Sequence, residues 1–117
     1  MEFNALILKQ LLPVLREYGF KVVNELHNIV QFQSPIIGIT ISYNNRENSF
    51  LVEVGKIGKD FYPLSDMAIR DIYNLEIHIE HVNQDDFIKN LLFLLKQPQG
   101  IQLLRGDLTL KKNNLTM

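Results

Sequence analysis

Two glycines and two lysines lie close together in the segment GKIGKD at residues 55–60, a composition that suggests a phosphate-binding loop. A Walker loop places four residues between its first glycine and a Gly-Lys-Ser/Thr sequence, and the helix that follows points its amides at the phosphates. Here two residues separate the glycines, Asp60 stands where the hydroxyl residue is needed, and Phe61-Tyr62-Pro63 prevents an immediate helix. The segment is therefore not predicted to bind phosphate.

The same glycines match the Gly-x-x-Gly loop with which KH domains clamp a nucleic-acid backbone. That loop joins two helices, whereas Gly55 and Gly58 follow a strand-like run and precede an aromatic-proline segment. The simpler interpretation is a turn that ends a strand and leaves its lysines in solvent. In addition, the net charge of −1 gives the whole chain no electrostatic attraction to nucleic acid or to anionic membranes.

The segment HIEH at residues 78–81 contains residue types that bind metals. A strand would put His78 and Glu80 on one face and His81 on the other, whereas a helix would bring the histidines together and turn Glu80 away. Neither spacing gathers the three or four ligands of a zinc site, so we predict no metal or other cofactor. No serine lies in a Gly-x-Ser-x-Gly elbow and cysteine is absent, so the chain is predicted not to be an enzyme.

The first half of the chain is predicted to contain the elements that would position these residues. Residues 2–18 place apolar side chains three and four positions apart, as in an amphipathic helix. Pro13 should kink this helix near its middle, and Gly19 should end it. One face of the sheet that follows is apolar, and the helix is expected to cover it. The predicted strands are 20–26, 29–34, 36–43 and 49–56, with turns at 27–28 and 44–48.

The second half of the chain is predicted to be mostly helical. A short helix is expected over 63–74, whereas 75–82 alternates like a strand but could also continue a helix. A clearer helix should begin at Asp85 or Asp86 and end before Pro98. Residues 101–108 are expected to add a short helical piece.

The order of these elements predicts an α+β fold. The N-terminal helix should pack on an antiparallel four-stranded sheet, and the C-terminal helices should follow. Without a repeat or a low-complexity linker, all 117 residues are expected to form one domain, with a frayed tail over about 109–117. The N-terminal segment lacks the basic start and the cleavage site of a signal peptide, so we expect a cytoplasmic protein.

Charge is distributed unevenly along the chain. Residues 60–86 contain seven acids and one base, a net charge of −6, whereas the other 90 residues contain eleven bases and six acids, a net charge of +5. Acids interleaved with aromatics are typical of a surface that docks on a basic partner, because charge steers the encounter and aromatic burial supplies binding energy. The alternative is a solvated face whose aromatics all point into the core. The candidate partner-binding residues are Asp60, Phe61, Tyr62, Asp66, Arg70, Asp71, Tyr73, Glu76, Glu80, Asp85 and Asp86.

Several stretches carry a family resemblance. They are the helix ending EYGF, the run VQFQSPIIGITISYNNREN, then FLVEVGK, FYPLSDM and the late FLLKQPQGIQLLRGDL. Together they resemble the small bacterial immunity proteins of contact-dependent growth inhibition and related polymorphic toxin systems. The resemblance implies a protein that binds the C-terminal toxin domain of its own system, often a nuclease, and blocks its active site or substrate groove. Because nuclease grooves are basic, such an inhibitor is expected to present acids.

Two functional hypotheses from different classes follow. The first is an immunity protein, expected to be a monomer that binds its cognate toxin domain and neither nucleic acid nor membrane. The alternative is a secretion chaperone, a homodimer of similar size that holds an effector protein in a non-globular form. The two differ in oligomeric state, because the chaperone needs a second copy joined through a hydrophobic helix or strand.

Overall fold

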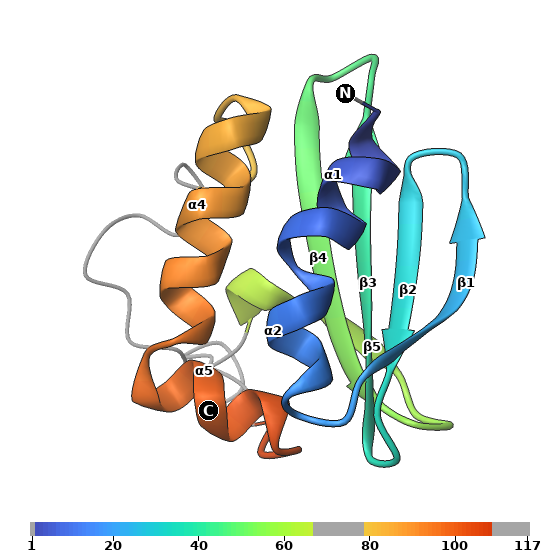
Figure 1. Ribbon diagram of the computed structural model, residues 1–117, viewed down its shortest axis with the longest axis vertical. Coiled ribbons are helices and arrows are strands. Elements are labelled where there is room, and N and C mark those ends of the chain that lie inside the picture. The colour runs from blue at the N-terminus through green and yellow to red at the C-terminus, as the bar shows by residue number, and fades with distance from the viewer. Residues whose placement is uncertain (1, 67–78, 109–117) are drawn as a thin grey trace, which may run out of the picture.

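The computed structural model describes residues 2–66 and 79–108, and shows a layer of helices packed on one sheet (Figure 1). The α+β class predicted from the sequence is confirmed. The elements are α1 (Phe3–Gln10), α2 (Leu12–Arg16), β1 (Lys21–Leu26), β2 (Ile29–Gln33), β3 (Ile37–Asn44), β4 (Ser49–Lys56), β5 (Phe61–Pro63), the 3-10 helix η1 (Leu64–Asp66), α4 (Gln84–Leu95) and α5 (Pro98–Leu104).

The sheet has five strands in the order β1-β2-β3-β4-β5, and each pairs antiparallel with its neighbours. The predicted number of four strands is therefore wrong. Gly58 adopts a φ of +77°, which glycine accepts without a steric penalty, and the Lys59 amide donates to the Lys56 carbonyl at 2.9 Å. This turn reverses the chain, so that β5 pairs with the last part of β4. The GKIGKD segment is thus part of a hairpin.

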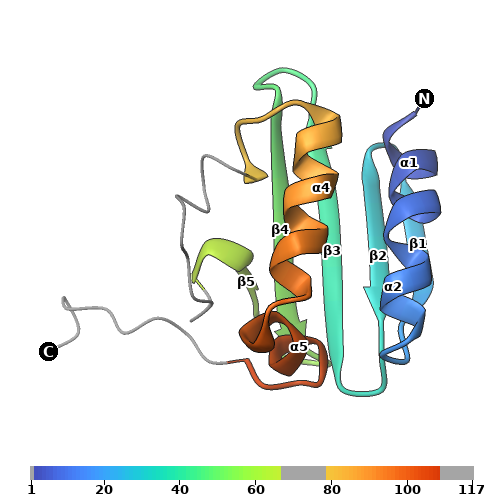
Figure 2. The same cartoon turned by 60° about the vertical axis from the view of Figure 1, so that its left-hand side comes forward.

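All of the described helices lie on one face of the sheet (Figure 2). The predicted alternation along β3 and β4 is confirmed, because Ile37, Ile39 and Ile41 of β3 are buried under the helices. Phe50, Val52 and Val54 of β4 are buried on the same face. The expected cover by the N-terminal helix is also confirmed, and α4 and α5 cover the rest of this face. The core is formed by Phe3, Ile7, Leu11, Leu15, Phe20, Val30, Phe32, Ile37, Ile39, Ile41, Phe50, Val52, Val54, Leu64, Ile79, Phe87, Ile88, Leu91, Leu94, Leu95, Leu103 and Leu104.

The N-terminal helix is interrupted where the sequence predicts a kink. α1 ends at Gln10 and α2 begins at Leu12, with Pro13 in the first turn of α2, where its missing N–H removes no helical hydrogen bond. Gly19 ends the helical segment with a φ of +85°, and the amide of Phe20 donates back to the Leu15 carbonyl at 3.1 Å. Both predicted features are confirmed.

The C-terminal helices agree with the sequence to within a few residues. α4 begins at Gln84 and is capped by Asn83, whose Oδ1 accepts from the Asp86 amide at 2.8 Å. The Asn83 amide group donates in return to the Asp86 carboxylate at 3.0 Å. α5 starts at Pro98, earlier than the predicted 101, because proline fits the first turn of a helix.

Part of the remaining secondary-structure prediction lies outside the described residues. Of the helix expected over 63–74, residues 64–66 form a 3-10 turn and 67–74 are not described. Of the ambiguous segment 75–82, residues 79–82 belong to no strand. Residues 75–78 and the expected frayed tail from residue 109 also lie outside the described ranges.

Replacement of Asn83 by alanine is expected to lower the free energy of unfolding by about 1 kcal/mol, because the cap satisfies a backbone donor of the first helical turn. Urea-induced unfolding followed by circular dichroism measures this change. The control is Gln102→Ala at an exposed position of α5, where alanine has the higher helix propensity and no loss is expected. Equal effects of the two substitutions would contradict the assigned cap.

Candidate functional site

The two ends of the sheet differ in what they carry. The turns β1–β2 at 27–28 and β3–β4 at 45–48 lie at one end, together with the start of α1 and of α4, and we call this the loop end (Figure 1). The β2–β3 connection at 34–36 and the β4–β5 turn at 57–60 lie at the opposite end, which we call the far end.

Four of the described acidic residues that the sequence singled out are divided between these ends. Asp60 precedes β5 at the far end, whereas Asp85 and Asp86 begin α4 at the loop end. The carbonyl of Glu80 accepts from the Phe50 amide at 3.0 Å, which places Glu80 beside the start of β4. β4 has eight residues, so about 23 Å separates its two ends.

Among the described acids of the predicted site, Asp66 belongs to neither end. Asp66 is exposed in η1, beside the middle of the sheet. Asp86 is exposed at the start of α4, and it also has a structural role, because its carboxylate accepts from the capping residue Asn83. Arg70, Asp71, Tyr73 and Glu76 lie outside the described residues. Their role in partner binding stays a prediction.

The aromatic pair of β5 points to opposite faces of the sheet. Phe61 lies on the face without helices and is 38% exposed, and its ring covers the cross-strand pair Gly38 and Gly55. Tyr62 lines a separate hollow of about 230 Å³ together with Lys59 and Leu108. Phe61 therefore packs on the sheet, and the hydrophobic area that it can offer a partner is reduced.

Alanine at position 55 is expected to destabilise the hairpin. A Cβ atom there would lie 2.5 Å from the Asp60 carbonyl oxygen and 2.6 Å from Cδ1 of Phe61. Because such overpacking typically costs about 1–3 kcal/mol, we expect a loss of this size in thermal or urea unfolding. Combining Gly55→Ala with Phe61→Ala removes the ring contact but leaves the clash with the carbonyl. An unchanged stability of the single variant would show that the ring does not rest on this glycine.

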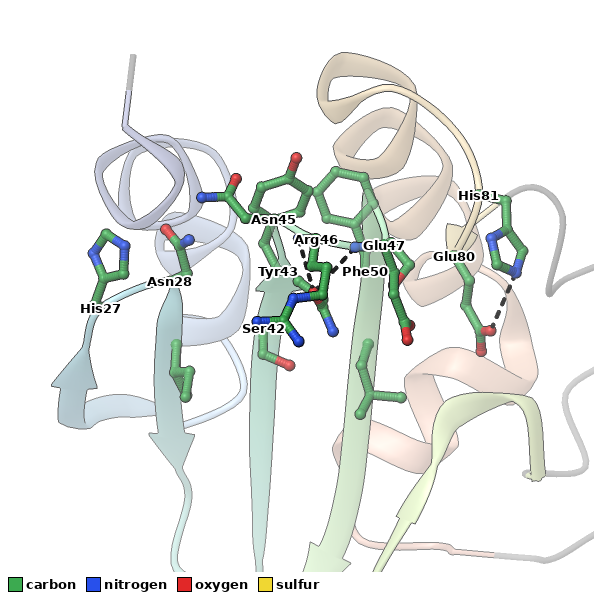
Figure 3. A pocket seen from close by; sticks show the side chains of 14 residues that line it. His27, Asn28, Ser42, Tyr43, Asn45, Arg46, Glu47, Phe50, Glu80 and His81 are labelled. Atoms are coloured by element: carbon green, nitrogen blue, oxygen red, sulfur yellow. Dashed lines mark hydrogen bonds and ion pairs between the residues drawn. The ribbon is translucent and has the colours of Figure 1, made fainter.

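A groove of about 930 Å³ opens on the face without helices, at the loop end (Figure 3). Its floor is a row of three cross-strand neighbours, Ile29, Ser42 and Leu51. The two hairpin turns and the segment Glu80-His81 form its walls. The lining residues are His27, Asn28, Ile29, Ser42, Tyr43, Asn44, Asn45, Arg46, Glu47, Ser49, Phe50, Leu51, Glu80 and His81.

The β3–β4 turn over this groove is held by its own side chains. Asn44 Oδ1 accepts from the amides of Arg46 at 3.0 Å and Glu47 at 3.2 Å, as in an Asx turn. The Tyr43 hydroxyl donates to Asn48 Oδ1 at 2.9 Å, and Asn48 adopts a φ of +49°, which asparagine tolerates. The turn predicted at 44–48 is confirmed. Its hydrogen bonds fix the backbone positions from which the Arg46 and Glu47 side chains extend.

An aromatic cluster supports the loop end on the face of the sheet that the helices cover. The rings of Phe50 and Phe87 stack with centroids 4.3 Å apart, and Phe3 and Tyr43 pack against Phe50 at 6.0 and 4.9 Å. The four rings come from β4, α4, α1 and β3. The turn that carries Arg46 and Glu47 is therefore tied to both helices and to the sheet.

Most of the described charges lie at one of the two ends of the molecule, and Lys9, Glu53, Asp66 and Lys89 lie between them. At the loop end six carboxylates face one base, and at the far end six bases face three carboxylates. The loop-end charges are Glu2, Glu25, Glu47, Glu80, Asp85, Asp86 and Arg46. The far-end charges are Arg16, Lys21, Lys56, Lys59, Lys96, Arg105, Glu17, Asp60 and Asp107. The described residues give the loop end a net charge of −5 and the far end +3, so the loop end would attract a basic surface more strongly than the far end.

Three of these carboxylates, those of Glu2, Glu25 and Glu47, were not among the predicted site residues. They come from the start of α1, the end of β1 and the β3–β4 turn, and only strand pairing brings them to one end. The predicted hairpins were sufficient to find them. In an antiparallel order of strands, the end of the first strand and the turn after the third strand lie at the same end of the sheet. Counting charges by strand end rather than by sequence window would have found them.

Within residues 2–66 and 79–108, His81 Nε2 lies 4.0 Å from Glu80 Oε2, a contact that is an ion pair only when the imidazole is protonated. In the same ranges no group of three His, Cys, Asp or Glu side chains converges as metal ligands would. None of the described helices has the length and apolarity required to cross a bilayer.

Comparison with known proteins found no matching family model, curated protein or solved structure.

Proposed function

We propose that this chain is a non-enzymatic protein-binding module that neutralises a toxin domain, as its resemblance to immunity proteins implies. Its partner is a protein with a basic surface, such as the substrate groove of a nuclease. The observation that carries the proposal is the separation of charge, which gathers six described carboxylates at one end of the fold. An inhibitor of this kind acts by covering the active site and performs no chemical step.

The loop end has the physical properties that fast and tight docking needs. Its charge of −5 accelerates the encounter with a basic surface, and the basic far end orients the molecule on approach. The hydrogen-bonded β3–β4 turn and the aromatic cluster hold the surface in place before the partner arrives. Such preorganisation limits the entropy lost on binding.

A second candidate, a homodimeric secretion chaperone, is favoured by one observation. The edge strand β1 exposes Val23 at 44% and Leu26 at 53%, and a second copy could cover them. Two features work against strand pairing there. The pairing of β1 with β2 shifts register between Val22 and Asn24, which bulges the strand at Val23, and the Asn4 side chain already donates to the Leu26 carbonyl at 2.7 Å.

Sedimentation velocity separates the two candidates. We expect one chain per particle at micromolar concentration, because the bulge and the Asn4 contact block the edge of β1. A stable dimer whose dissociation requires substitution of Val23 or Leu26 by a charged residue would favour the chaperone and contradict the proposed monomer.

Co-expression tests the proposed function. We expect the gene to follow one for a large secreted toxin, and the C-terminal domain of that toxin to be the partner. Cells that produce this domain should survive only when the chain is co-produced, and the two proteins should purify together. Survival without the chain, or death in its presence with no complex formed, would contradict the proposal.

A further inference from the structure

Arg46 is the one Lys or Arg side chain at the loop end among the described residues. Its guanidinium makes no ion pair within these residues, although Glu47 follows it directly in the chain. Figure 3 shows the side chain lying over the groove toward Ser42, with Glu47 beyond it. The backbone amide of Arg46 donates to Asn44 Oδ1 at 3.0 Å, so the backbone that carries the guanidinium is fixed.

The walls of the groove differ in what they offer a ligand. His27 and Asn28 lie on one side of Arg46, and Glu47, Glu80 and His81 lie on the other (Figure 3). Beneath Arg46, Ser42 provides a hydroxyl between two apolar neighbours, Ile29 and Leu51. A ligand here would meet a guanidinium and hydrogen-bond donors above an apolar floor, and carboxylates at one edge.

We infer that this groove recognises a single carboxylate of the protein partner, an Asp or Glu side chain flanked by apolar residues. The guanidinium presents paired N–H donors that match a carboxylate, and the partner's apolar residues would cover Ile29 and Leu51. A phosphate group fits less well, because its second negative charge would be repelled by Glu47 and Glu80. The inference rests on the proposed function for the identity of the natural partner, although its test does not need that partner.

The site would provide specificity at a surface that is otherwise attractive to any basic protein. A partner whose surface is uniformly basic places a cation against Arg46 and is repelled there. A partner with one carboxylate at this position pairs with Arg46, while its surrounding bases pair with the loop-end acids. One cation among six carboxylates thus selects the cognate partner from other basic proteins.

The test is a titration of the isotope-labelled full chain with two blocked tripeptides, Ac-Leu-Asp-Leu-NH2 and Ac-Leu-Asn-Leu-NH2, followed by NMR. The Asp peptide should shift the amide signals of Ile29, Ser42 and Leu51 and saturate in the millimolar range. The Asn peptide should bind about threefold more weakly, since an exposed ion pair contributes up to about 1 kcal/mol, a factor of about five at most. The variant Arg46→Gln should lose this preference, whereas Lys59→Gln at the far end should retain it.

The outcomes separate this inference from the proposed function. Equal binding of the two peptides, no binding, or an unchanged preference in Arg46→Gln would overturn the inference and leave the toxin rescue experiment unaffected. Because the Arg46 side chain makes no ion pair within the described residues, the Gln variant is expected to fold. Unchanged signals of Phe50 and Phe87 in its spectrum verify this.

Discussion

Replacement of Phe87 by alanine is expected to lower the free energy of unfolding by about 3–5 kcal/mol. The side chain is fully buried, and its ring stacks on Phe50 at an interplanar angle of 7°. Its removal leaves a cavity at the point where α4 meets the sheet and takes away the ring that links the loop end to this helix. Urea-induced unfolding measures the loss.

The matched control for this variant is Phe93→Ala in the same helix. Phe93 is 48% exposed, so its truncation removes the same atoms from a position that faces solvent. A change within about 0.5 kcal/mol is expected, as for most surface substitutions. If the two variants lost equal stability, the aromatic cluster would not be the anchor of the loop end.

Neutralising three loop-end carboxylates is expected to slow association with the toxin domain by about tenfold or more at low salt. The variant is Glu47→Gln/Glu80→Gln/Asp85→Asn, which leaves the helix-capping partner Asp86 in place. The reason is that local charge steers the encounter. The association rate constant, measured by stopped-flow fluorescence, should become less dependent on salt in this variant, while the dissociation rate changes less.

The control for this experiment carries the same change in net charge at the far end. It is Glu17→Gln/Asp60→Asn/Asp107→Asn, which removes all three described far-end carboxylates. Association of this variant should remain within about twofold of the original chain, because its altered charges lie beyond a Debye length from the docking surface. Equal slowing by both triple variants would mean that net charge acts and that the loop end has no special role.

The sequence predicted the regular elements well because their signals are local. The helix broken near Pro13, its end at Gly19 and the alternation in β3 and β4 each depend on residues a few positions apart. The strand β5 was missed because three residues carry no periodicity. Its existence depends on a turn through Gly58 that returns the chain to β4.

The candidate site was less predictable because it depends on contacts between distant residues. The position of Phe61 over Gly38 and Gly55 follows from the register of three strands, which no window of sequence contains. The acidic segment was a correct local observation, but its described members Asp60, Glu80, Asp85 and Asp86 divide between the two ends of the sheet, and Asp66 lies at neither end. The groove under Arg46 could not be predicted, because it is lined by residues of two hairpin turns that are distant in the sequence.

Hydrogen exchange of the complex with the toxin domain locates the docking surface, because it shows which backbone amides the partner covers. We predict slowed exchange at the loop end, in the turns at 27–28 and 44–48 and in the segment 80–86. Exchange in the turn at 57–60 at the far end should be unchanged. Protection confined to the far end, or to the outer surfaces of the helices, would contradict the claim that the loop end is the docking surface.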